Sequence, residues 1–245
     1  MEKVDVVILT KNSERLLKAC LESIYENVPV NRLIVIDAFS VDNTLKILDK
    51  FNVKYGNIKI VQEKGSRGKA RDIGIREVET EWFMFVDSDA ILCEDWFKKA
   101  SRHIHKSIGA IWGVSIEGDV KSKPVVKVVQ WMAARTFDIR GCCKDILIRH
   151  DAVKDIHIPS KLHTLEDAYL KEWIIAKNYK VIISYESYCR HYKTMNNLLS
   201  KENIMSTIVE FKNMRLVKER LVYAPIFAFI WFLVEANQKF RGRGV

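Results

Sequence analysis

Two aspartates directly follow a run of apolar residues in this chain. The run Trp82–Val86 is continuous and has the length of a buried strand, and Asp87 and Asp89 follow it with Ser88 between them. Two carboxylates at the end of a buried strand cost free energy unless a positive group binds them. Divalent cations prefer oxygen ligands and often bind together with substrate phosphates. The spacing therefore indicates either a metal site for a phosphorylated ligand or a strand end with two solvated acids.

Three earlier strand-like runs are also followed by polar or charged residues. The runs are 4–9, 33–36 and 58–61, and the residues after them are Thr10-Lys11-Asn12, Asp37 and the segment 63–71. Stretches with helical spacing of apolar residues lie between the runs, at 13–27, 40–51 (with Ser40 as the expected N-cap) and 69–78. This alternation predicts an α/β fold whose central sheet is mostly parallel, with helices on both faces. Ligands bind at the carboxyl ends of strands in such sheets, so the polar residues gather where a ligand site is expected.

The remainder of the chain is less regular and ends in a helical appendage. We expect strands at 108–114, 145–149 and 179–184, and helices at 124–137 and 165–178. The division predicted is a catalytic domain over 1–195 and a helical tail over 196–245. Within the tail, the uncharged run 221–234 is shorter than the roughly 20 residues of a membrane-spanning helix. Because cations follow it, we expect 221–243 either to lie in a membrane interface or to pack on the domain or on a second subunit of a homodimer.

Composition restricts the partners and the compartment. The 245 residues include 40 Lys and Arg against 31 Asp and Glu, a net charge of +9 that favours anionic partners. Five cysteines show no C-x-x-C spacing, and the first residues show no secretory signal, so we expect a cytoplasmic protein, peripheral on the inner face of the plasma membrane if the tail binds lipid. We expect no nucleic-acid partner, because basic strands interleaved with aromatic residues are missing.

Five segments within residues 3–195 carry motifs in a fixed order. They are the opening strand and turn 6–12, the turn that begins Asp37-Ala38-Phe39-Ser40, the segment Ala70-Arg71-Asp72-Ile73-Gly74, the triplet Asp87-Ser88-Asp89 and the acidic pair Glu166-Asp167. Together they resemble the motifs of family 2 glycosyltransferases with the glycosyltransferase A fold. The chain departs from the family pattern at Ala38, where a second acid is usual, and at Asp72, where Asn is usual.

The resemblance implies an inverting, metal-dependent glycosyltransferase whose site residues can be named. Asp167 is the expected general base, with Glu166 as its competitor, because a carboxylate there can take the proton of an acceptor hydroxyl. The remaining roles are donor binding by Thr10, Asp37, Lys69, Arg71, Asp87 and Gly141, and metal binding by Asp89, Asp87 and His191. Physical chemistry supports several of these roles, since a carboxylate accepts from a base N–H and a guanidinium suits phosphate. Structural alternatives stay open: Asp37 as a helix-end charge, Arg71 paired with Asp72 or Glu63, and His191 as a packed residue.

The implied ligands follow from the same resemblance. The donor is a nucleotide-diphosphate sugar of UDP or GDP type, the cofactor is Mg²⁺ or Mn²⁺, and the acceptor is a glycan or a lipid-linked or surface saccharide. A polyprenyl-phosphate sugar synthase is an alternative. A nucleotidyltransferase is a weaker one, because Thr10-Lys11-Asn12 contains no glycine where such enzymes have a glycine-rich loop. An inactive relative is a further alternative, because of the departures at Ala38 and Asp72.

Overall fold

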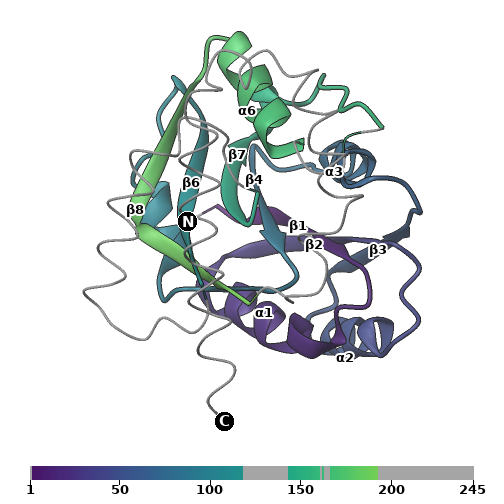
Figure 1. Ribbon diagram of the computed structural model, residues 1–245. Coiled ribbons are helices and arrows are strands. Elements are labelled where there is room, and N and C mark those ends of the chain that lie inside the picture. Colours follow the sequence, from purple (N-terminus) through teal and green to yellow (C-terminus); the bar gives the residue numbers. More distant parts are fainter. Residues whose placement is uncertain (1, 118–142, 161, 163–165, 193–245) are drawn as a thin grey trace, which may run out of the picture.

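The computed structural model describes residues 2–117, 143–160, 162 and 166–192 (Figure 1). The predicted helix 124–137, the loop residue Gly141 and the whole tail 196–245 lie outside the described residues. The predicted division into a domain and a tail therefore stays a prediction.

The described chain forms an eight-stranded mixed sheet in the order β3-β2-β1-β4-β7-β6-β8-β5. The strands are β1 Val4–Thr10, β2 Val30–Asp37, β3 Ile58–Gln62, β4 Trp82–Asp87, β5 Ala90–Leu92, β6 Ile108–Glu117, β7 Asp145–Arg149 and β8 Lys180–His191. The four strands from β3 to β4 are mutually parallel, as predicted, and β6 also pairs with β8 in parallel. The other neighbours, β4 with β7, β7 with β6 and β8 with β5, are antiparallel. The α/β class is confirmed, and the second half of the sheet is more mixed than the strand pattern indicated.

Helices cover both faces of this sheet. They are α1 Glu14–Asn27, α2 Thr44–Tyr55, α3 Arg67–Arg76, α4 Trp96–Ser101 and α6 Glu166–Ala176, with a short 3-10 turn at His150–Ala152. In Figure 1, α1 and α2 lie below the sheet and α3 and α6 lie above it. Side chains of β1 alternate between the two layers, since Val6 and Ile8 belong to one hydrophobic cluster and Val7 to the other. None of the described helices combines the length and apolar character needed to span a membrane.

Two local predictions are refined by the structure. Helix α2 begins at Thr44, after an N-cap at Asn43, because the predicted cap Ser40 instead donates its hydrogen bonds to Asp37. Helix α3 begins earlier than predicted, at Arg67, where the Ser66 hydroxyl accepts from the backbone N–H of Lys69 at 3.1 Å.

A glycine lets α3 approach the sheet closely. A Cβ atom at Gly74 would lie 2.5 Å from Cγ1 of Val7 on β1, closer than carbon atoms pack. The glycine of the Ala70–Gly74 segment therefore has a packing role that brings α3, with Arg71 on it, down onto the strand ends.

Candidate active site

The carboxyl ends of β2, β1 and β4 lie side by side at one edge of the sheet. Thr10 of β1 pairs with Asp37 of β2, and Leu9 pairs with Asp87 of β4. Adjacent strands lie about 4.8 Å apart, so Asp37 and Asp87 are separated by two strand spacings, about 10 Å. The polar residues that the sequence placed after separate strands therefore share one edge, as predicted.

Two carboxylates and one imidazole meet at the end of β4. Asp87, Asp89 and His191 each offer an atom within 4.8 Å of the others, and Nε2 of His191 lies 3.1 Å from Oδ1 of Asp89. The pairing of β5 with the end of β8 sets this geometry, because Ala90 is opposite His191. Nδ1 of His191 is buried and has no hydrogen-bond partner among the described residues.

This set of donors fits a divalent cation. Carboxylate oxygens suit Mg²⁺ and Mn²⁺, and an imidazole can add a nitrogen ligand to a divalent transition metal. Burial raises the pKa of Asp89, but the hydrogen bond and charge of His191 outweigh burial and hold that pKa below its usual value. Asp89 is therefore ionised at neutral pH, as a metal ligand must be.

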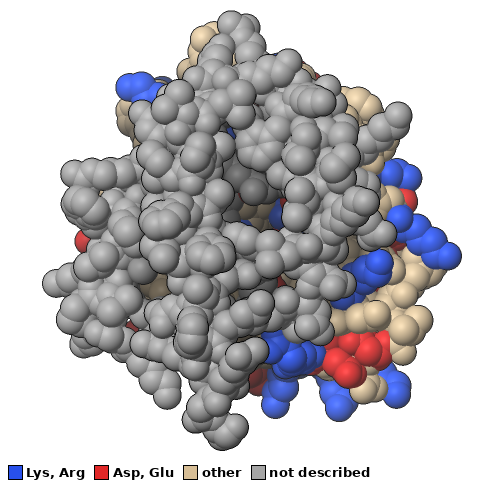
Figure 2. All heavy atoms as spheres, viewed as in Figure 1, with Lys and Arg blue, Asp and Glu red and all other residues tan. Residues whose placement is uncertain are grey.

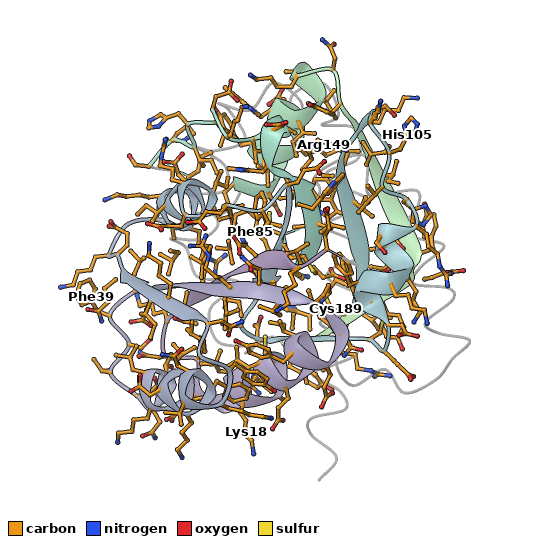
Figure 3. The ribbon with its side chains drawn as sticks, turned by 180° about the vertical axis from the view of Figure 1, so that it is seen from behind. Lys18, Phe39, Phe85, His105, Arg149 and Cys189 are labelled. Carbon is orange, nitrogen blue, oxygen red and sulfur yellow. The ribbon has the colours of Figure 1, made fainter. Side chains whose placement is uncertain are left out.

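Arg71 is a buried cation that joins two parts of the site. Its Nη2 lies 3.1 Å from Oδ1 of Asp87 and its Nε lies 3.5 Å from Oε1 of Glu166. The guanidinium also lies over the ring of Phe85, 4.8 Å from the ring centre (Phe85 is labelled in Figure 3). Burial lowers the pKa of Arg71, but the neighbouring Cys143, Asp87 and Glu166 raise that pKa by more than burial lowers it. The side chain therefore stays charged.

The alternative ion pairs weighed for Arg71 are not formed. Asp72 pairs with Arg76 and Glu63 pairs with Lys69, whose amino group lies 2.9 Å from Glu63. Nη1 of Arg71 is buried without a partner among the described residues. One donor of the fork is therefore left for a further group at the site.

The two neighbouring acids at the start of α6 have different environments. Glu166 is buried, and burial raises its pKa although Arg71 opposes that shift. Asp167 is half-buried, and its Oδ1 accepts from the backbone N–H of Ala168 at 2.8 Å. Asp167 is therefore the more accessible carboxylate, whereas Glu166 is committed to Arg71.

Asp37 connects the loops that follow β1 and β2. Its buried carboxylate accepts from the hydroxyl of Thr10 at 2.8 Å and from the hydroxyl and backbone N–H of Ser40 at 2.5 and 2.9 Å. These bonds fix the shape of the strand ends. The predicted contacts of Asp37 and Thr10 with a base or ribose stay predictions.

The departure at Asp72 has a structural role in this chain. One oxygen of Asp72 accepts from the backbone N–H of Ile158 at 3.1 Å, and the other lies 3.1 Å from Nε of Arg76. Asp72 therefore ties the segment after β7 to α3, and its side chain does not reach the metal cluster in the contacts described.

Sequence motifs did not indicate Lys144 and Asp145, which open β7 beside the cluster. The backbone N–H of Asp87 donates to the carbonyl of Lys144 at 3.1 Å, and the Lys144 amino group donates to Ser115 at 3.2 Å. Asp145 is buried and accepts from Nε1 of Trp96 at 2.9 Å, and burial raises its pKa to about 7. The signal in the sequence that could have indicated these two residues is a pair of charged residues directly before an apolar run.

Exposed cations lie on the loop that leads into α3 and on the first turn of that helix. Lys64, Arg67 and Lys69 are exposed. Figure 2 shows Lys and Arg side chains along the right edge of the molecule, where this loop runs in Figure 1. The edge of the sheet that carries the acids is therefore flanked by positive charge, which suits an anionic ligand.

Comparison with known proteins places the chain in a family and gives a curated relative. The model of the family described as Glycosyl transferase family 2 matches residues 5–153. The poly(ribitol-phosphate) beta-N-acetylglucosaminyltransferase TarS of Staphylococcus aureus is 26% identical over 183 residues, which are 68% of this chain and 31% of TarS. This chain thus spans about a third of the length of that relative.

Solved structures share the fold. A crystal structure of S. aureus TarS residues 1–349 with UDP-GlcNAc matches with a TM-score of 0.64 and 23% identity, over 82% of this chain and 61% of that chain. The mannosyltransferase PcManGT from Pyrobaculum calidifontis, in complex with GDP-Man and Mn²⁺, matches with a TM-score of 0.62 and 17% identity, over 80% and 58%.

Proposed function

Because the chain belongs to glycosyl transferase family 2, we propose that it transfers a sugar from a nucleotide-diphosphate donor to an acceptor hydroxyl. The observation that carries the proposal is the meeting of Asp87, Asp89 and His191 within 4.8 Å at the strand ends, next to the buried cation Arg71. Such a site can bind a divalent cation together with a phosphorylated ligand. Acids that only cap a strand would need neither of them.

The donor would lie along the strand ends with its diphosphate at β4. A bound Mg²⁺ or Mn²⁺ would neutralise the charge on the departing diphosphate. Asp89 and His191 would hold the cation, and Asp87 would hold it or the ribose. Arg71 already bridges Asp87 and Glu166, so it fixes the orientation of Asp87 and offers its free Nη1 to the ligand. Lys69 is exposed on the first turn of α3 and would reach a phosphate only by leaving Glu63.

The transfer itself requires one base. The acceptor oxygen attacks the anomeric carbon, its proton passes to Asp167, and the bond from carbon to diphosphate oxygen breaks with its electron pair leaving on the nucleotide. A single displacement of this kind inverts the anomeric centre. Asp167 suits the role because it is the accessible acid, and Glu166 would act as a positioning residue for Arg71.

One relative supports a class of acceptor. TarS is named for transfer to poly(ribitol-phosphate), so we propose a polyol-phosphate or saccharide acceptor on a surface polymer or lipid carrier. This relative does not favour the polyprenyl-phosphate sugar synthase alternative, and the family match argues against a nucleotidyltransferase. Peripheral membrane contact through 221–243 and a homodimer remain predictions.

Release of nucleotide diphosphate tests the proposal. The full chain is incubated with UDP- and GDP-sugars, a poly(ribitol-phosphate) acceptor and Mn²⁺ or Mg²⁺, and free UDP or GDP is measured. We expect turnover that chelation abolishes and that Asp89→Ala lowers at least about 100-fold, since loss of metal-ligand charge removes several kcal/mol of transition-state stabilisation.

A matched variant controls for loss of charge alone. Asp49 is exposed on α2, and Asp49→Ala should keep full turnover. Turnover in EDTA, or an Asp89→Ala enzyme as fast as wild type, would show that the metal assignment is wrong.

A further inference from the structure

Phe39 is an exposed aromatic residue held in a strained backbone conformation. Its φ angle is 54°, in the left-handed region that bulky residues avoid, and 44% of the residue is exposed. It lies two positions after Asp37, on the turn between β2 and α2, and Figure 3 shows it at the outer edge of the molecule. Phe39 belongs to neither of the hydrophobic clusters of the described fold.

Hydrogen bonds on both sides hold the turn in this conformation. The backbone N–H of Ala38 donates to the carbonyl of Thr10 at 2.9 Å, and that of Ser40 donates to Asp37 at 2.9 Å. The side chain of Asn12 accepts from the backbone N–H of Val41, also at 2.9 Å. Strained residues persist where the surroundings over-determine them, and they cluster at ligand sites. The backbone of the turn that carries Phe39 is therefore held in a fixed shape.

A lysine from the neighbouring loop lies over the ring. Nζ of Lys64 is 4.8 Å from the ring centre of Phe39, a cation–π contact that joins the turn after β2 to the loop after β3. The residue is still 44% exposed, so the turn combines a flat apolar surface with a positive charge. An aromatic surface binds a nucleobase by stacking, and a positive charge binds the phosphates attached to it.

The turn that carries Phe39 follows the strand end where the base of a bound nucleotide is expected. Asp37 ends a strand two spacings, about 10 Å, from Asp87, so a nucleotide with its diphosphate at β4 extends its base toward the turn after β2. The carboxylate of Asp37 already accepts three hydrogen bonds. Recognition of the base there therefore needs a contact besides that carboxylate.

We infer that the Phe39 ring is the stacking surface for the nucleobase of the donor and that Lys64 supports the ring. The inference rests on the proposed function, because it assumes a nucleotide diphosphate at the metal cluster. It adds Phe39, a position that the family motif leaves unspecified, to the residues that determine donor affinity.

Nucleotide binding to Phe39→Gly tests the inference. Stacking of a base on an aromatic residue changes affinity by roughly 5- to 150-fold. Titration calorimetry of the full chain with UDP and with GDP, in Mn²⁺, should therefore show affinity about 5- to 150-fold weaker in Phe39→Gly for the nucleotide that wild type prefers. Glycine tolerates the left-handed backbone, so this variant should melt no earlier than wild type. Phe39→Trp should retain most of the affinity.

Two comparisons make the result specific. Pyrophosphate has no base, so its affinity in Mn²⁺ should be equal in Phe39→Gly and wild type. Val53, which is 90% exposed on α2, serves as the matched control, and Val53→Ala should bind every ligand as wild type does.

The outcomes separate the inference from the proposed function. If Phe39→Gly binds the nucleotide as tightly as wild type, or loses pyrophosphate and nucleotide equally, the stacking role is wrong and the proposed function stands. If wild type binds neither nucleotide in the presence of metal, the proposed function fails and the stacking role fails with it.

Discussion

Replacement of Arg71 by methionine should destabilise the protein strongly, because it leaves two carboxylates without their cation. The side chains of Arg71 and Glu166 are 4% and 6% exposed, whereas that of Asp87 is 30% exposed. Removing one partner of a buried ion pair costs about 3–5 kcal/mol. Solvent screens Asp87, and Glu166 can relieve its own charge by taking up a proton, so we expect the lower end, about 3 kcal/mol.

Thermal and urea unfolding measure this loss directly. In a chain of this size, 1 kcal/mol corresponds to about 2–4 °C in Tm, so Arg71→Met should lower Tm by about 6–12 °C. The double variant Arg71→Met/Glu166→Gln should recover at least about 1.5 kcal/mol of that loss, since it removes the buried charge together with its partner. Arg71→Lys should fall between wild type and Arg71→Met, because an ammonium keeps the charge but not the fork that reaches both acids.

Arg76→Met is the matched control. Arg76 also lies on α3 and also pairs with a carboxylate, but its side chain is 54% exposed, so its loss should cost less than about 1 kcal/mol. The reasoning would be refuted by an Arg71→Met protein as stable as Arg76→Met, or by a double variant no more stable than Arg71→Met.

The remaining predictions concern Asp145 and Asp72. Burial raises the pKa of Asp145 from its usual 3.8 to about 7, so the folded state holds a proton that the unfolded state has lost, and stability falls as pH rises from about 4 to about 7. Unfolding measured across this range should therefore show a shallower decline in Asp145→Asn, and an equal slope in both proteins would contradict the assignment. Asp72→Asn keeps an acceptor for the N–H of Ile158 and loses only the pair with Arg76, so it should cost less than about 1 kcal/mol. Asp72→Ala leaves that N–H without its acceptor and should cost about 1–3 kcal/mol; equal unfolding midpoints for the two variants would show that the Ile158 contact contributes nothing.

The first half of the fold could be predicted because its signals are local. Each strand from β1 to β4 is a short apolar run, each helix between them repeats apolar residues at helical spacing, and the parallel order follows from that alternation. The second half carried weaker information. Strand β5 is only three residues long, and whether β7 and β8 run parallel or antiparallel to their neighbours depends on segments between them that have no clear period.

The sequence by itself determined which chemistry the chain carries: the acids after the strand ends, the Arg of α3 and the order of the family motifs. Tertiary structure alone decided which of those groups contact one another. Arg71 and Glu166 are 95 positions apart. A local sequence pattern cannot predict a contact between residues that far apart in the chain. Arg71 pairs with Glu166 and Asp87 and not with its neighbour Asp72, and burial is the reason. The packing of Gly74 against Val7 draws α3 onto the strand ends. A buried charge without a partner is costly there.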